Sequence, residues 1–220
     1  MVRHFFLLLL MIALLLIAAP LWAEKPVYRV GIHSSPPLAF IDEAGTPDGL
    51  FPELLTLASP NHELQYIACR WTECLQQLER GEIDLLAPIA FTPERGKIYD
   101  FLETTVLSNW GQVYVPHQAD ISSILDLDGK RVAAIGQDVF LEGAGGLRQL
   151  ADSFDLKINY VIVKDYDDAL KAVADNRADA ALINRIFGAW HRNEYALEPS
   201  SVLINPVDIR VAFARGHAIP

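Results

Sequence analysis

A pattern that occurs twice constrains the fold of this chain more than any other feature. Five positions, an aromatic residue, two apolar residues, a turn residue and an aspartate, recur 95 positions later. The pairs are Trp71 and Tyr166, Leu75 and Leu170, Leu78 and Val173, Gly81 and Asn176, and Asp84 and Asp179. In each copy the spacing predicts a helix with one buried face, ended by the left-handed Gly or Asn and followed by an apolar strand. We therefore predict two similar α/β lobes with a ligand-binding cleft between them.

Composition narrows the possible partners. The chain has 28 Asp plus Glu against 18 Lys plus Arg, a formal net charge of -10. That much negative charge argues against nucleic acid and anionic membrane surfaces as partners. No His lies at ligand spacing from either cysteine, so we expect no metal and no cofactor.

The first 23 residues have the pattern of a secretory signal. A positive start at Arg3 is followed by the apolar run 5–19 and by Ala23, the residue before the expected cut. The alternative is an uncleaved membrane anchor, because the 19 residues 5–23 are just long enough to span a bilayer. We favour cleavage because the run before Pro20 has the length of a signal's apolar region.

Two cysteines flank a predicted corner between a strand and a helix. In an oxidising compartment, Cys69 and Cys74 are placed to form a short-range disulfide. The alternative is a pair of buried thiols.

Strand and helix patterns alternate along the chain, which indicates a mostly parallel sheet in each lobe. In the first lobe we expect strands at 27–32, 63–69 and 83–87, and helices at 50–58 and 72–80. In the second we expect strands at 131–135, 158–163 and 180–183, and helices at 139–153, 167–174 and 185–193. Extended stretches at 104–108 and 111–115 cross between the lobes, and a strand at 209–214 returns. Lobe 1 is thus expected at 24–112 plus 208–220, and lobe 2 at 113–207.

Six motifs along the chain point to a known family. They are PPLAF at 36–40, GLFPEL at 49–54, the Trp71 pattern through Asp84, TPER at 92–95, DLDGKRV at 126–132 and DAAL at 179–182. In this order, they resemble the type 2 periplasmic solute-binding proteins, family 3, the amino-acid-binding branch. The resemblance implies an α/β fold of two lobes that close on a small solute like a flytrap, joined by a two-crossing hinge. It also implies a periplasmic location and an inner-membrane permease or receptor as partner.

A narrower set of residues is similar to the extracytoplasmic sensor regions of histidine kinases and diguanylate cyclases. The set comprises 142–146, Ser153 and Phe154, Asp165 and Tyr166, and 184–188. The family continues into a further helix beyond the return strand, whereas this chain ends at Pro220, and the sequence leaves open whether it is a fragment of a longer receptor.

The resemblance assigns ligand contacts to several residues. Arg95 of the Thr92-x-x-Arg95 motif is expected to bind a carboxylate with its planar guanidinium, the alternative being a salt bridge to Glu94. Trp71 is expected to form an aromatic wall of the cleft, the alternative being core packing. Tyr166, the repeat partner of Trp71, matches no site position of the family.

Other site positions depart from the family's pattern. Pro88 and Ala90 replace small hydroxyl residues, and Ser35 replaces an aromatic residue. The Thr that begins the first helix of the second lobe is replaced by Asp138 or Val139, and the Asp that receives a ligand's ammonium group is replaced by Asn184.

The neutral Asn184 decides our expectation for the ligand. A zwitterionic amino acid would have an under-compensated ammonium group in a dry cleft. With Arg95 in place and Arg185 expected nearby, a small carboxylate or a polar solute without an amine fits better.

We weigh three functions. The first is a binding protein that presents its closed form to a membrane partner. The second is a periplasmic dehydratase on the same fold, for which Glu53 or Asp179 would act as general acid without an evident second catalytic group. The third is a ligand-free, degenerate sensor fragment, suggested by the eroded site.

Overall fold

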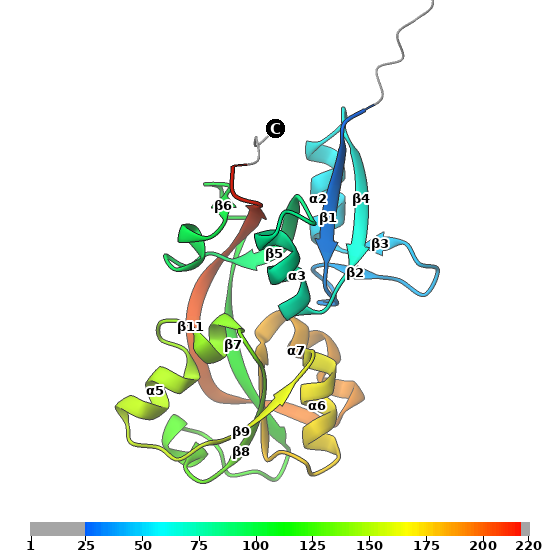
Figure 1. Cartoon of the computed structure of the whole chain (residues 1–220). Coiled ribbons are helices and arrows are strands. Elements are labelled where there is room, and N and C mark those ends of the chain that lie inside the picture. The colour runs from blue at the N-terminus through cyan, green and yellow to red at the C-terminus, as the bar shows by residue number, and fades with distance from the viewer. Residues whose placement is uncertain (1–24, 217–220) are drawn as a thin grey trace, which may run out of the picture.

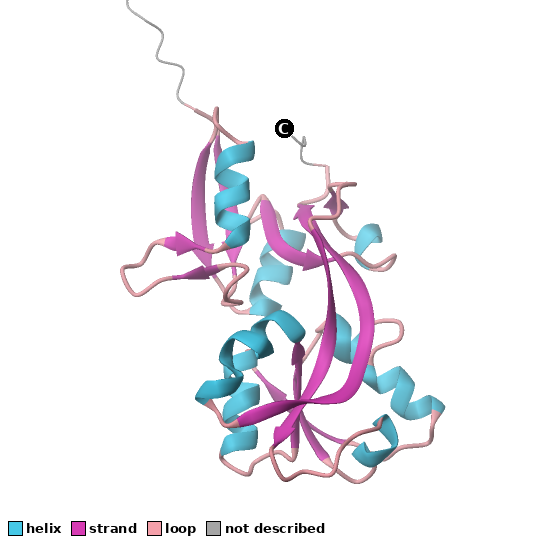
Figure 2. Ribbon diagram, turned by 180° about the vertical axis from the view of Figure 1, so that it is seen from behind, coloured by secondary structure: helices cyan, strands magenta, loops and turns pink. Residues whose placement is uncertain are grey.

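The computed structural model describes residues 25–216, which form two stacked lobes (Figure 1). Two long strands, β7 (Leu107–Pro116) and β11 (Leu197–Phe213), run antiparallel to each other through both lobes. Figure 2 shows the same two strands from behind as the connection between the lobes. The predicted signal sequence lies outside the described residues. Within residues 25–216, no helix has both the length and the apolar character needed to cross a membrane.

The first lobe is built on three parallel strands. Its central strand β1 pairs in parallel with β4 and with β5. The elements are β1 (Val27–Ile32), the hairpin β2 (Phe40–Ile41) and β3 (Pro47–Asp48), α2 (Leu50–Ala58), β4 (Glu63–Ala68), α3 (Trp71–Glu79), β5 (Leu85–Ala90), the short η1 (Arg95–Lys97) and β6 (Asp100–Phe101).

The second lobe repeats this plan. Its central strand β8 pairs in parallel with β9 and β10, and α6 packs on β8 and β10. The elements are η2 (Ile124–Leu127), β8 (Arg131–Ile135), α4 (Val139–Glu142), α5 (Leu147–Ser153), β9 (Asn159–Val163), α6 (Tyr166–Ala174), β10 (Ala180–Asn184), α7 (Arg185–His191) and η3 (Arg192–Glu194). In the described part the strand order is β4-β1-β5-β11-β7-β10-β8-β9, with β6 beside β11.

The repeated motif forms the same interaction in each lobe. Arg29 in β1 binds the carboxylate of Asp84 through its main-chain N–H and its guanidinium, and donates to the carbonyl of Gly81. Arg131 in β8 makes the same bonds to Asp179 and to the carbonyl of Asn176. Both turn residues have the predicted left-handed conformation, with φ 67° at Gly81 and 57° at Asn176. The repeat is therefore a structural device that joins the end of a helix to the neighbouring strand.

Three element predictions were wrong. The helix expected at 139–153 is broken into α4 and α5, because the glycines at 143, 145 and 146 place extended and left-handed backbone between them. The return strand begins at Leu197 and not at 209, since register shifts accommodate the prolines and polar residues of 198–206. Residues 107–115 of the stretches expected at 104–108 and 111–115 lie in one continuous strand, β7, and residues 104–106 precede it.

Cys69 and Cys74 form a disulfide, so the first of the two sequence-based alternatives is correct. The bridge joins the end of β4 to the first turn of α3. It holds Trp71, which lies between the two cysteines, at the boundary between the lobes.

Candidate functional site

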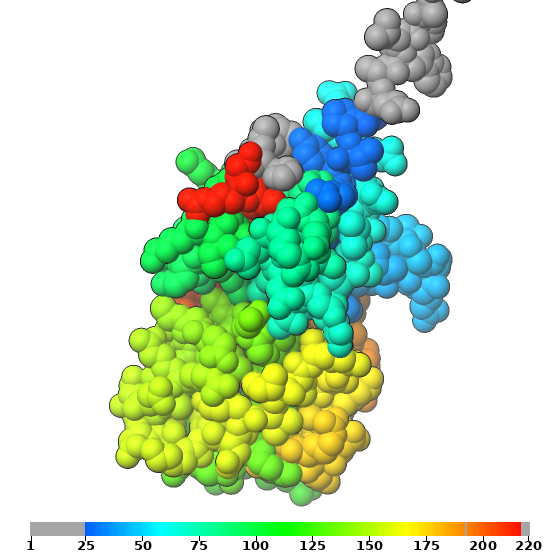
Figure 3. Space-filling view, viewed as in Figure 1, coloured from blue at the N-terminus to red at the C-terminus, as the bar shows by residue number. Residues whose placement is uncertain are grey.

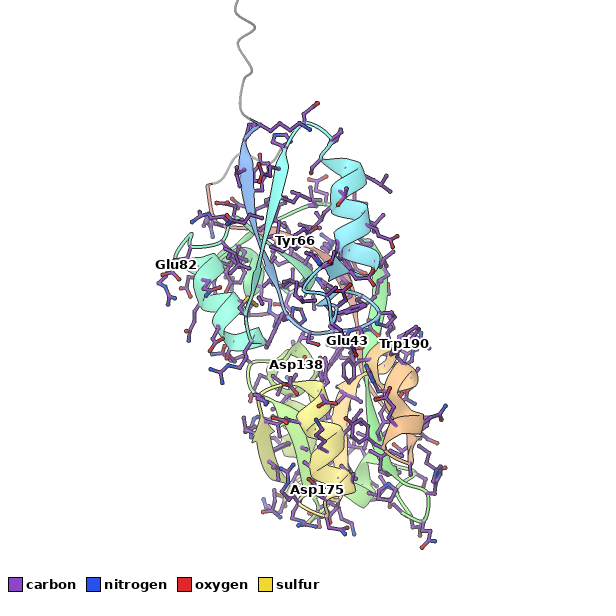
Figure 4. The ribbon with its side chains drawn as sticks, turned by 90° about the vertical axis from the view of Figure 1, so that its right-hand side faces the viewer. Glu43, Tyr66, Glu82, Asp138, Asp175 and Trp190 are labelled. Carbon is purple, nitrogen blue, oxygen red and sulfur yellow. A yellow bond between two sulfur atoms is a disulfide. The ribbon has the colours of Figure 1, made fainter. Side chains whose placement is uncertain are left out.

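A cavity of about 140 Å³ lies between the lobes, and both lobes contribute to its walls. The space-filling view in Figure 3 shows the two lobes in contact with each other. Asp138 lies at the boundary between them (Figure 4). The cavity is at the carboxyl ends of the parallel strands, which is where open α/β sheets bind ligands. Seven of the eight residues predicted for the site line it: Ser35, Trp71, Ala90, Arg95, Asp138, Val139 and Asn184.

Thr92 is the eighth residue, and it does not line the cavity. Its hydroxyl accepts the main-chain N–H of Arg95 at 3.1 Å and so shapes the turn that presents the guanidinium. Its role in the structure is therefore to position Arg95.

Arg95 reaches from lobe 1 to lobe 2. Its guanidinium is held by two main-chain carbonyls, that of Ala90 at 3.0 Å and that of Gln137 at 3.1 Å. No carboxylate of residues 25–216 forms an ion pair with it, so the alternative of a salt bridge to Glu94 is not found there. Burial lowers the pKa of Arg95, and the nearby Asp138 charge partly offsets this effect. An arginine side chain nevertheless keeps its charge at neutral pH.

Trp71 begins α3 and closes the cavity beside Arg95. The guanidinium carbon of Arg95 lies 5.1 Å from the centroid of the indole, a cation-π distance. The indole N–H donates to the carbonyl of Gln137 at 3.3 Å. Trp71 also packs against buried residues of both lobes, so cavity wall and core packing are both correct descriptions.

Ser35 and Asn184 face each other across the lobe boundary. The Asn184 amide nitrogen is 3.4 Å from the Ser35 hydroxyl, a long hydrogen bond. The Asn184 carbonyl oxygen accepts the main-chain N–H of Phe187 at 2.7 Å, which orders the first turn of α7. Asn184 therefore presents a donor, and no charge, to the cavity.

Two acidic residues, Asp138 and Asp165, line the cavity, and Asp138 is the buried one. It caps α4, accepting the main-chain N–H of Phe140 at 3.1 Å through Oδ1. Its Oδ2 accepts the hydroxyl of Tyr166 at 2.5 Å. Burial raises the pKa of Asp138, against the opposing effects of the hydrogen bonds and of Arg95. The pKa of Tyr166 is raised well above its usual value by burial and by the Asp138 charge.

His33 and Tyr166 line the cavity but were not among the predicted site residues. The ring of His33 lies edge-on to Trp71, with centroids 4.9 Å apart, and burial lowers its pKa to about 4. Its Nδ1 is buried without a hydrogen-bond partner in the described chain. His33 directly follows β1, and Tyr166 is the repeat partner of Trp71. Those two signals in the sequence could have identified them.

Three residues considered from the sequence lie elsewhere. The guanidinium of Arg185 stacks on Trp110, 4.1 Å from the ring centroid, and does not line the cavity. Glu53 lines a shallow surface groove on lobe 1, and Asp179 is bound to Arg131. The two candidate general acids therefore lie outside the cavity.

Comparisons with known proteins agree with this arrangement. Residues 28–122 match the model of bacterial extracellular solute-binding proteins, family 3, which confirms the resemblance over that part of the chain. The amino-acid-binding protein AabA of Dichelobacter nodosus is 31% identical over 122 residues, covering 52% of this chain and 47% of that protein. The chain thus matches about half the length of this relative.

Solved structures show the fold. An ancestral arginine-binding protein bound to arginine aligns with a TM-score of 0.78 at 19% identity, covering 87% of this chain and 86% of that chain. A histidine kinase sensor domain with similarity to periplasmic binding proteins aligns with a TM-score of 0.76 at 20% identity, covering 88% and 84%. At these identities the likeness concerns the fold alone, and it confirms the predicted two-lobed α/β class.

Proposed function

We propose that this chain, whose residues 28–122 match family 3 of the extracellular solute-binding proteins, captures a small polar or anionic solute by closure of its lobes. The closed form is then presented to a membrane partner. Ligand binding favours closure because the ligand contacts both lobes only in the closed arrangement.

The proposal rests mainly on Arg95, whose guanidinium lines the cavity without a carboxylate partner among the described residues. A half-buried guanidinium without an ion-pair partner in the described chain offers a fork of donors to a carboxylate. The indole of Trp71 covers one side of it, with the ring centroid 5.1 Å from the guanidinium carbon. Both features favour a ligand that brings its own negative charge.

The size of the cavity limits the ligand. An engineered cavity of about 150 Å³ in another protein holds benzene, and this one measures about 140 Å³. We therefore propose a ligand of about six non-hydrogen atoms in the closed form.

The charge of the cavity weakens the sequence-based argument against a solute with an amine. That preference rests on Asn184, which is neutral. Asp138 places a carboxyl group in the same cavity, so the absence of a charge at Asn184 does not by itself exclude an amine. The preference for a carboxylate remains supported by Arg95.

The location, the partner and the lobe boundaries are further parts of the proposal. We propose that the protein is exported, which the family description supports, and that residues 1–23 are removed on export. The partner is a permease or a kinase-type receptor of the inner membrane, and the fold of a sensor domain supports the second kind. We place lobe 1 at 24–112 plus 208–220 and lobe 2 at 113–207.

Release by osmotic shock of a chain shortened by 23 residues would test the export and the cleavage.

A thermal-shift screen of the purified protein against carboxylates, amino acids and sugars tests the function. A ligand at about 100 times its Kd stabilises the folded state by about 2.7 kcal/mol, which raises Tm by several degrees in a chain of this length. We expect small carboxylates to do so with the wild type and not with Arg95→Ala. Stabilisation by sugars alone, or equal stabilisation of the variant, would contradict the proposal.

A further inference from the structure

Asp138 and Tyr166 are placed to control which charge the cavity accepts. We propose, on the basis of the proposed function, that the two residues form a proton-linked switch. Protonation of Asp138 changes the group to which the Tyr166 hydroxyl donates its hydrogen bond. When Asp138 is ionised, the Tyr166 hydroxyl donates to it, and the charge of Arg95 is already balanced before an anion binds. When Asp138 is protonated, this hydrogen bond reverses, and the Tyr166 hydroxyl donates to the bound carboxylate.

The geometry allows both states. The Oδ2 of Asp138 lies 2.5 Å from the Tyr166 hydroxyl, and the two residues are only 6% and 7% exposed. A phenol hydroxyl both donates and accepts, and its hydrogen rotates to suit its neighbours. The second oxygen of Asp138 is held by the N–H of Phe140, so α4 keeps the carboxyl group in place in either state.

The charges around Asp138 give the switch its direction. The titratable and charged residues that line the same cavity are His33, Arg70, Arg95, Lys164, Asp165 and Tyr166. Burial lowers the pKa of His33 to about 4, so it is neutral near pH 7. Arg70 is paired with Glu73, Lys164 lies 3.5 Å from Asp168, and Asp165 accepts the first-turn N–H of Asp168. We therefore take the half-buried Arg95 and the buried Asp138 as the two charges that a ligand meets.

An anionic ligand disturbs the balance between these two charges. With Asp138 ionised, the pair is neutral, and a carboxylate adds a negative charge that no buried group compensates. Uptake of one proton by Asp138 removes the excess. Burial already raises the pKa of this carboxyl group, which lowers the cost of the uptake.

The proton balance is simple. The proton comes from the solvent and is held on Oδ2 of Asp138, from which it is donated to the Tyr166 oxygen. Tyr166 keeps its own proton and donates it in a hydrogen bond to the ligand carboxylate. No other covalent bond forms or breaks, and one proton is taken up for each anion bound.

The test uses two probes of equal size, lactate and alanine, which differ by a hydroxyl group in place of an ammonium group. Isothermal titration at several pH values, in buffers of different ionisation enthalpy, measures affinity and proton uptake together. We expect lactate to bind with uptake of about one proton and to lose about tenfold in affinity per pH unit above the pKa of Asp138. This measurement on the wild type requires no variant to fold.

Three variants test whether Asp138 and Tyr166 cause the pH dependence of lactate binding. Asp138→Asn keeps a capping side chain but does not titrate, so lactate affinity should become independent of pH, with no proton uptake. Tyr166→Phe removes the donor and should weaken lactate binding about tenfold. Glu142→Gln, which removes an exposed charge from the same helix, should change neither quantity.

Three results would overturn the switch. Lactate binding that needs Arg95 but shows no proton uptake and no response to Asp138→Asn would overturn it while leaving the proposed function intact. Tighter binding of alanine that is lost in Asp138→Asn would show that Asp138 is an ionised receptor for ammonium. Failure of both probes and of every other carboxylate to bind would overturn the proposed function, and the switch with it.

Discussion

The guanidinium of Arg95 in lobe 1 donates a hydrogen bond to the main-chain oxygen of Gln137 in lobe 2 at 3.1 Å. Trp71 donates to the same oxygen from lobe 1. Gln137 has a left-handed backbone, with φ 61°, which turns its carbonyl toward lobe 1. The residues that line the cavity therefore also hold the lobes together, so ligand binding and lobe closure are coupled.

Substitution Trp71→Phe should favour the open form. The phenyl ring keeps the aromatic wall but loses the N–H that binds Gln137, a neutral hydrogen bond whose loss costs about 1 kcal/mol. We expect a larger radius of gyration without ligand, measured by small-angle X-ray scattering, and an affinity lower by about fivefold. The control is Trp190→Phe, which changes an exposed tryptophan on α7. An unchanged radius of gyration and affinity in Trp71→Phe would contradict the coupling.

The two copies of the repeat should differ in their contribution to stability. The Asp84 side chain is 9% exposed and that of Asp179 is 35% exposed, although both make the same bonds to an arginine. Asp84→Asn should therefore lower the free energy of unfolding by about 2 to 3 kcal/mol, and Asp179→Asn by about 1 kcal/mol or less. Urea denaturation measures both, and each variant is the matched control of the other. Equal losses would show that burial does not set the difference.

Loss of the disulfide should lower the melting temperature. The bridge between Cys69 and Cys74 closes a short loop, with a sequence separation of 5, so chain entropy predicts a contribution of about 2 kcal/mol. For a chain of this length, that corresponds to a decrease of about 4 to 8 °C in Tm. The double variant Cys69→Ala, Cys74→Ala and the reduced wild type should show the same decrease by calorimetry. A reducing agent that lowers Tm of the double variant as much as that of the wild type would contradict this assignment.

His33 should make the protein less stable in mild acid. Burial lowers its pKa from 6.5 to about 4 in the folded state, so the unfolded chain binds the proton more readily than the folded chain. The stability from the neutral imidazole is fully present above pH 6.5 and is lost as the pH falls from 6.5 to 4. At pH 4.5 the loss amounts to about 2.5 kcal/mol.

The variant His33→Gln tests this dependence, because glutamine does not titrate. Between pH 7.5 and pH 4.5, it should lose about 2.5 kcal/mol less in free energy of unfolding than the wild type. His62→Gln, which changes a histidine outside the cavity, should follow the wild type. Identical pH profiles for the wild type and His33→Gln would refute the assignment to His33.

The scaffold was predictable from the sequence because it depends on local patterns. The repeat predicted two helices with buried faces, their left-handed ends at Gly81 and Asn176, and the strands that follow. The glycines at 143, 145 and 146 interrupt the helix expected over 139–153. The polar and proline-containing start of β11 gave no strand signal, because pairing with β7 stabilises it through the main chain.

The sequence predicted those residues of the site whose side chains belong to a single motif. Arg95 and Trp71 line the cavity, and their contact with a ligand stays a prediction. The contact with Gln137 uses a main-chain oxygen, and its partner depends on how the lobes meet, which no local pattern encodes. The ligand preference predicted from the sequence depends on Asn184 alone. Asp138 enters the same cavity from a different loop and changes its charge. The charge of a cavity is a property of the folded arrangement.

The central claim is that Arg95 binds the carboxylate of a small solute in the cavity. Isothermal titration of the carboxylate that stabilises the protein most, into Arg95→Met and Lys97→Met, tests it most directly. Both variants remove one positive charge from the same turn, but Lys97 is exposed and lies outside the cavity. We predict that Arg95→Met loses about 2 to 5 kcal/mol of binding free energy, at least thirtyfold in Kd, and that Lys97→Met stays within twofold of the wild type. Equal affinities for Arg95→Met and the wild type would contradict the claim.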